Sequence, residues 1–126
     1  MNVALWIIAG LLAAVFATAG ALKLTLPKEK LAGAGLAWVD DFTQAQVRLI
    51  GLVELLAAAG LVLPAALDVV PVLVPVAAIG LAALMAGAAL THARRGETAL
   101  IAVNVVLIAL AVLVAVERFG PESFPA

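Results

Sequence analysis

The chain has 126 residues, 67% of them hydrophobic and 12% charged, with a net charge of −1 and a mean hydropathy of +1.27. Soluble domains average about 45–50% apolar and about 25% charged residues, so the polar residues here are too few to cover a soluble core. The near-neutral charge excludes a basic surface for nucleic acid. Cysteine is absent and His92 is the single histidine, which excludes disulfides, thiolate metal sites and a bis-histidine haem within one chain. We therefore predict a small polytopic membrane protein.

Four apolar runs are long enough to cross a bilayer, which needs about 20 helical residues. They are residues 3–22, 43–63, 71–90 and 99–116. Strands this apolar on both faces would lack the alternation of membrane barrel strands, so helices are expected. The predicted fold class is an all-α membrane protein, a four-transmembrane-helix bundle, with residues 1–126 as a single transmembrane domain.

The second run has a clear start and a clear stop. Thr43-Gln44-Ala45-Gln46 has the form of a capping box, in which two side chains satisfy free backbone N–H groups at the helix start. Phe42 and Val47 fit a hydrophobic staple around that start. Pro64 is expected to end the helix, because proline lacks a backbone N–H and crowds the preceding turn.

The third run has two prolines near its start and a glycine shortly after its end. Pro71 suits the first turn of its helix. Pro75, four residues further on, either shifts that start or bends the helix. Gly96 follows the run and is expected to lie beyond the end of the helix.

The connection over residues 23–42 is the only long one. Pro27 followed by Lys28-Glu29-Lys30-Leu31 predicts a short helix. Trp38, Val39 and Phe42 then form a short amphipathic segment of the kind that lies at a membrane interface, where Trp is enriched. Two roles are open for this segment, a tether resting on the membrane or a lid over a cavity on the cytoplasmic side.

The Lys and Arg residues predict the orientation in the membrane. Of the seven, only Arg118 lies on the side that carries the termini. Because short cytoplasmic loops are enriched in Lys and Arg, the loops after the first and third runs are expected to be cytoplasmic, with the N and C termini outside. The residues on the expected cytoplasmic side are Lys23, Lys28, Lys30, Arg48, Arg94 and Arg95.

Small residues are frequent on the spans, where they allow helices to approach closely in lipid. We expect this packing role for nearly all the glycines. Examples on the first and third runs are Gly10, Ala14, Ala17, Gly80, Ala83 and Gly87.

Glu54 is the only ionisable residue in the stretch 49–63, and it lies about 16 Å along the helix from Thr43, near the membrane midplane. A charge at that depth costs from a few to well over ten kcal/mol, roughly, and such residues face a bundle interior, a partner or a wet cavity. Candidate partners are Asn104, His92 and Lys23. Two roles are open, a buried polar pair that fixes helix register, or a carboxylate that carries a proton or anchors a ligand.

The candidate ligand-binding set consists of Glu54, Asn104, His92, Lys23 and Arg48. Arg48 lies about 240° around the helix from Glu54, so the two do not share a face. His92 is otherwise an interfacial residue near a helix C-terminus, and Lys23 otherwise extends its side chain to the lipid headgroups. No catalytic residue and no metal site can be assigned.

The chain resembles the DoxX-like integral membrane protein family of DoxX- and DoxD-type four-helix proteins. The resemblance rests on an ordered set of short motifs along nearly the whole length. They are Gly20-Ala21-Leu22-Lys23-Leu24, Arg48-Leu49-Ile50-Gly51-Leu52-Val53-Glu54, Gly60-Leu61-Val62-Leu63-Pro64, Gly87-Ala88, His92, Arg95-Gly96-Glu97 and Asn104.

This resemblance implies a four-helix bundle in the cytoplasmic membrane of a bacterium. It also implies distant kinship with the small subunit of thiosulfate:quinone oxidoreductase, methylamine-utilisation membrane proteins and the membrane domain of vitamin-K-dependent carboxylase. Some of these relatives handle quinones or act beside redox enzymes, while others are chaperones or cargo receptors. Without a soluble domain or a cysteine, this chain is not expected to oxidise thiosulfate by itself.

The predicted function is therefore binding of a quinone or isoprenoid-type lipid in an intramembrane pocket. The quinone would be held non-covalently, and the chain would be an accessory subunit of a quinone-linked oxidoreductase. Two alternatives stay open. One is a non-enzymatic scaffold or assembly factor for a partner membrane protein. The other is a small proton-coupled transporter, which would need to form a homo-oligomer to build a path.

Overall fold

The computed structural model describes residues 1–125 and is helical along most of this length. Within those residues four helices are long and apolar enough to cross a membrane, and no strand is present, which confirms the predicted all-α membrane fold. The long helices are α1 (Asn2–Thr25), α3 (Gln44–Ala66), α4 (Leu73–Arg94) and α5 (Thr98–Phe119), and between α1 and α3 lie the short helix α2 (Lys28–Gly33) and the 3-10 helix η1 (Ala37–Asp41).

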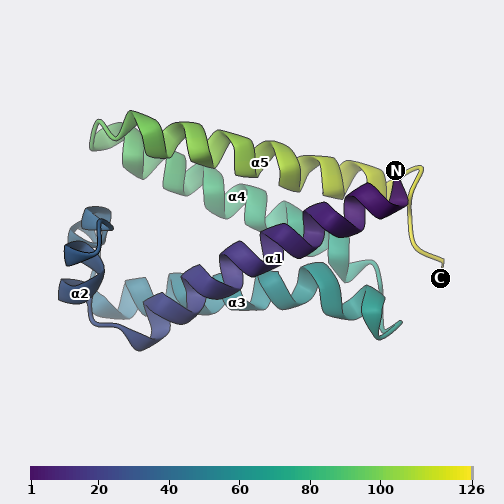
Figure 1. Ribbon diagram of the computed structural model, residues 1–126, viewed down its shortest axis with the longest axis horizontal. Coiled ribbons are helices and arrows are strands. Elements are labelled where there is room, and N and C mark those ends of the chain that lie inside the picture. Colours follow the sequence, from purple (N-terminus) through teal and green to yellow (C-terminus); the bar gives the residue numbers. More distant parts are fainter. Residues whose placement is uncertain (126) are drawn as a thin grey trace.

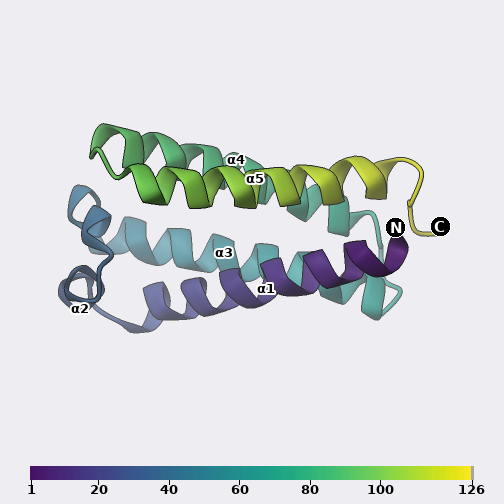
Figure 2. The ribbon, with the colours of Figure 1, turned by 45° about the horizontal axis from the view of Figure 1, so that its top comes forward.

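The long helices form two antiparallel hairpins. Helix α1 packs along α3, α4 packs along α5, and α3 joins the two hairpins through its contact with α4. One end of the bundle carries α2 and the turn between α4 and α5, and the other end carries both termini (Figures 1 and 2). We call these the α2 end and the termini end.

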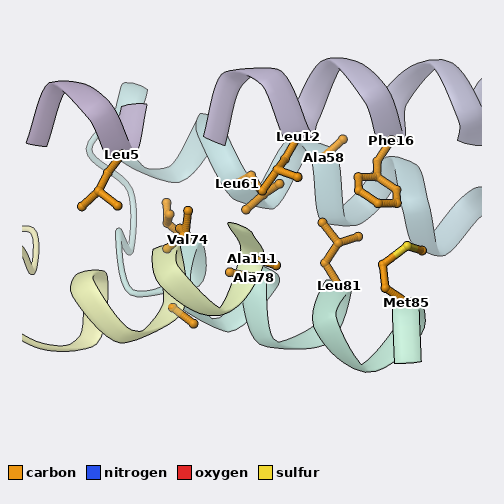
Figure 3. Close-up of a cluster of buried hydrophobic side chains, with 12 residues drawn as sticks. Leu5, Leu12, Phe16, Ala58, Leu61, Val74, Ala78, Leu81, Met85 and Ala111 are labelled. Atoms are coloured by element: carbon orange, nitrogen blue, oxygen red, sulfur yellow. The ribbon is translucent and has the colours of Figure 1, made fainter. Parts of the chain in front are cut away.

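A hydrophobic core fills the bundle from the termini end. Its buried side chains come from all four long helices, and Figure 3 shows them pointing into the space between the hairpins. Leu5, Leu61, Val74 and Val114 are each buried almost completely. Outward-facing Leu, Ile and Val side chains cover the rest of the helices, and they are exposed because lipid is their solvent.

Each long helix ends three or four residues beyond its predicted span. In α1, α4 and α5 the helix continues through polar residues beyond the predicted span, and in α3 it continues through Pro64, Ala65 and Ala66. The extension has a consequence for the site, because it places both Lys23 and His92 inside the last turn of a helix.

The start of α3 has the predicted capping box. The Thr43 side chain accepts from the Gln46 N–H at 3.1 Å, and Gln46 Oε1 accepts from the Thr43 N–H at 2.9 Å. The predicted staple is also present, since Phe42 packs against the cluster that contains buried Val47. These two contacts fix the angle at which the chain enters α3.

The prediction that Pro64 ends α3 is wrong, because the helix continues through it to Ala66. Proline within the last turn removes only one hydrogen bond, and the turn closes around it. The N–H of Leu67 donates to the Leu63 carbonyl at 2.8 Å, and the N–H of Val69 donates to the Pro64 carbonyl at 2.9 Å.

Helix α4 begins at Leu73, so Pro75 shifts the helix start, one of the two outcomes expected for it. Pro75 then lies in the first turn, where backbone N–H groups have no intrahelical acceptor and proline costs little. Pro71 was expected in that turn and instead precedes the helix. At the other end Gly96 has a φ of +70°, and the Glu97 N–H donates to the His92 carbonyl at 2.9 Å, which is a Schellman ending.

The glycines differ in role. A Cβ added to Gly20 would lie 2.6 Å from the Gly51 carbonyl oxygen, so α1 and α3 meet backbone to backbone at this point. A Cβ on Gly10, Gly80 or Gly87 would have no atom within 4 Å. A Cβ on Gly60 would lie 2.9 Å from Ala77 Cβ on α4. The expected packing role therefore holds for Gly20, Gly51 and Gly60, and not for the three open positions.

Candidate functional site

A cavity of about 550 Å³ lies between the two hairpins toward the α2 end. Phe16 and Met85 belong both to its wall and to the hydrophobic core, so the cavity begins where the core stops. Most of the wall is apolar. The polar side chains in the wall come from all four long helices, and they are Lys23, Glu54, Thr91, His92 and Asn104.

Lys23 and Glu54 form an ion pair in the wall. The Lys23 Nζ atom lies 2.6 Å from Glu54 Oε1, and the two residues are only 8% and 2% exposed. Of the partners predicted for Glu54, the structure places Lys23 in contact with it. The pair neutralises two charges that would each be costly in the membrane alone.

The backbone contact between α1 and α3 determines this pairing. Lys23 follows Gly20 by three residues and Glu54 follows Gly51 by three, so each lies on the same helix face as its glycine. The helices are antiparallel, and side chains tilt toward the N-terminus of their own helix. Lys23 therefore leans into the bundle and Glu54 leans toward the α2 end, which brings their ends together.

Trp38 from η1 covers the cavity at the α2 end. Lys23 Nζ lies 5.4 Å from the centre of the indole ring, and the ring of His92 meets the indole edge-on at 6.4 Å. Leu36 and Phe42 line the cavity beside it. The aromatic side chains of this segment therefore line the cavity, while its aspartates are exposed.

One ion pair joins η1 to the turn between α4 and α5, and two further contacts lie within that turn. Arg95 lies 3.0 Å from Asp41 Oδ1 and 3.3 Å from Glu97 Oε1, and His92 Nδ1 lies 2.9 Å from the same Glu97 oxygen. The hydrogen bond with Asp41 raises the pKa of the Arg95 guanidinium above its ordinary value. Arg95 therefore stays charged and links the two segments.

Asn104 on α5 is only 7% exposed, and its Nδ2 atom has no hydrogen-bond partner. The residue lines the cavity from the hairpin opposite the Lys23–Glu54 pair. A buried amide without a partner costs free energy, about 1–3 kcal/mol for each unmade hydrogen bond. Such a group in a cavity wall is suited to bind an acceptor atom of a ligand.

Arg48 differs from the other candidates. Its side chain is exposed and does not line the cavity, as its position on another face of α3 implies. Sequence reasoning also left Trp38 and Glu97 out of the candidate set. Trp38 was assigned to a segment that rests on the membrane or covers a cavity, without being named as a ligand contact. The contact of Glu97 with His92 depends on the tight turn at Gly96.

The model of the DoxX-like family matches residues 7–114. The chain belongs to the DoxX-like family. The match confirms the resemblance seen in the sequence, and it covers all four long helices and the cavity. Comparison with curated proteins and with solved structures finds no match.

The cavity of this DoxX-like protein combines an apolar wall with a few polar side chains. Within residues 1–125 no three His, Asp, Glu or Cys side chains gather as metal ligands would. What the wall offers is a large apolar surface with a few hydrogen-bonding groups on opposite sides, an arrangement typical of pockets for small organic molecules and lipids.

Proposed function

We propose that the chain forms a single transmembrane domain that binds a quinone or isoprenoid-type lipid in the cavity, as an accessory subunit beside a redox enzyme. The observation that carries the proposal is the cavity itself. Its volume of about 550 Å³ falls within the usual range for ligand pockets, about 300–1,000 Å³. Its wall is apolar apart from a few buried polar side chains.

These polar side chains would orient the head group. Asn104 Nδ2 is a free donor for a carbonyl or hydroxyl oxygen. Lys23 and Glu54 offer a second polar point on the facing hairpin, already neutral as a pair. Trp38 offers a flat ring on which an aromatic head group can stack at the α2 end.

The cavity wall also reaches the lipid. Val15 on α1 and Val103 on α5 line the cavity although they are 48% and 52% exposed. Gly87 on α4 lines it too, with no atom near the position of an added Cβ. An apolar tail can therefore leave sideways into the bilayer while the head group stays inside, which suits a prenylated ligand.

We further propose that the protein resides in a bacterial cytoplasmic membrane with the α2 end in the cytoplasm and both termini outside. The basic residues support this orientation. Lys28, Lys30, Arg94 and Arg95 gather at the α2 end, whereas Arg118 at the termini end is buried and donates to the Glu122 carbonyl.

The test is mass spectrometry of small molecules extracted from protein purified in mild detergent. Asn104→Leu is the variant of choice, because Asn104 Nδ2 has no hydrogen-bond partner within residues 1–125 and its loss should leave folding intact. Arg48→Gln, outside the cavity, is the matched control. A stoichiometric quinone or prenyl lipid in the wild type and control that is lost in Asn104→Leu supports the proposal. Only bulk phospholipid in all three contradicts it.

A second candidate is a non-enzymatic scaffold or assembly factor for a partner membrane protein. The observation in its favour is the Lys23–Glu54 contact, because Glu54 already has a partner and can fix helix register without any ligand. The same extraction experiment separates the two, since a scaffold would carry no stoichiometric small molecule.

A further inference from the structure

The cavity wall presents one free donor and one free acceptor on the second hairpin. The donor is Asn104 Nδ2. The acceptor comes from His92, whose Nδ1 lies 2.9 Å from Glu97 Oε1. A carboxylate oxygen only accepts, so Nδ1 carries the proton of this contact, and Nε2 of the neutral imidazole keeps its lone pair. Nε2 lies on the opposite edge of the ring, and His92 lines the cavity.

Surrounding contacts hold the His92 ring in this orientation. Glu97 is itself contacted by Arg95 Nε at 3.3 Å, which keeps a positive charge beside the carboxylate. The imidazole meets Trp38 edge-on at 6.4 Å, which restricts rotation of the ring. A carboxylate that accepts from one ring nitrogen fixes the tautomer and makes the other nitrogen a better acceptor.

His92 and Asn104 line the cavity at different depths. His92 lies in the last turn of α4, while Asn104 lies nearly two turns into the antiparallel helix α5. Their depths in the bundle therefore differ by about one helical turn, roughly 5 Å. A ring that bridges the two side chains needs a hydrogen bond of about 3 Å beyond each of its two oxygens.

We propose that the cavity selects the hydroxyl-bearing, reduced form of such a ring, a hydroquinone, over the corresponding quinone. This inference rests on the proposed function and specifies the ligand further. One hydroxyl donates to His92 Nε2 while the other oxygen accepts from Asn104 Nδ2. A quinone carries only acceptors, so it satisfies Asn104 and leaves Nε2 facing an oxygen that cannot donate to it.

The Lys23–Glu54 pair does not decide the choice. Lys23 can donate to either form and Glu54 can accept only from the hydroxyl, but each is already engaged by the other. Within residues 1–125, Nε2 of His92 has no hydrogen-bond partner, so it is open to a ligand hydroxyl. An unpaired buried acceptor lowers affinity on the order of tenfold, which sets the size of the expected preference.

The experiment compares three probes on the full chain in lipid nanodiscs by calorimetric titration, without oxygen and in mildly alkaline buffer, where a free imidazole is uncharged. The probes are decylubiquinone, its hydroquinone, and the bis-methyl ether of that hydroquinone, which keeps the oxygens but cannot donate. The hydroquinone should bind about tenfold more tightly than both others. Equal affinity for all three overturns the inference and leaves the proposed function standing. Absence of binding by all three overturns both.

Two variants assign the preference to the dyad of His92 and Glu97. His92→Phe keeps an aromatic ring against Trp38 and removes the acceptor, so the ratio of the two dissociation constants should fall to about one. Glu97→Gln keeps the side-chain length but can donate to Nδ1, which releases the tautomer and should lower the ratio as well. Arg48→Gln, outside the cavity, should keep the wild-type ratio. An unchanged ratio in His92→Phe would overturn the assignment.

Discussion

Gly20 and Gly51 touch where α1 crosses α3, and this contact sets the position of the buried ion pair that follows one turn later on each helix. A Cβ on either glycine would lie within 2.8 Å of the other's carbonyl oxygen. The distance between the helices at this height is therefore fixed by the absence of side chains. Both the ion pair and one side of the cavity depend on it.

Replacing Gly20 by alanine should destabilise the protein by about 1–3 kcal/mol, because backbone atoms at the crossing cannot move aside without shifting a helix. Gly10→Ala on the same helix is the matched control. Its Cβ would meet no atom within 4 Å, so the change should be neutral or stabilising by up to about 1 kcal/mol. Reversible unfolding in detergent measures both, and equal stability of the two variants would contradict the crossing contact.

The Lys23–Glu54 pair makes a prediction of its own. Each single variant, Lys23→Met or Glu54→Leu, leaves an uncompensated buried charge and should cost about 3–5 kcal/mol. The double variant removes both charges and should recover most of that loss. A double-mutant cycle by thermal or denaturant unfolding gives the coupling free energy. Additive losses would mean that the two side chains do not act as a pair in the membrane.

The contact between Asp41 and Arg95 should hold the aromatic segment over the cavity. Asp41 is half-exposed, so Asp41→Asn should change global stability by less than about 1 kcal/mol. Local opening should nevertheless increase, because this is the ionic contact between η1 and the end of α4. In a Trp6→Phe background, acrylamide quenching of Trp38 reports that opening. Asp40→Asn, at the neighbouring exposed position, is the control and should quench as the parent does.

The fold was predictable because each signal is local. Span length and hydropathy determine the helices, and the capping box at Thr43 needs only four consecutive residues. The predicted end of α3 at Pro64 was wrong, because a proline in the last turn removes only one backbone hydrogen bond and the helix continues past it. The predicted end of the third span also came too early, because α4 continues through polar residues such as His92.

The site was only partly predictable, because its contacts join distant parts of the chain. Depth alone singled out Glu54, but the choice of Lys23 over Asn104 as its partner depends on the crossing at Gly20 and Gly51. The place of Trp38 over the cavity depends on how the connection folds back, and no spacing along the sequence specifies this. In contrast, the angle between Arg48 and Glu54 around the helix correctly predicted that the two side chains lie on different faces, and only Glu54 lines the cavity.

The proposed orientation can be tested directly, because the chain contains no cysteine and a single introduced thiol is unambiguous. Glu29→Cys places a thiol on exposed α2, and Ser123→Cys places one at the exposed termini end. Neither substitution alters the Lys and Arg count that sets topology. In intact cells a membrane-impermeant maleimide should label Ser123→Cys and spare Glu29→Cys, while both should react after the membrane is broken. Labelling of Glu29→Cys alone in intact cells would contradict the proposed orientation and would show that the α2 end lies outside.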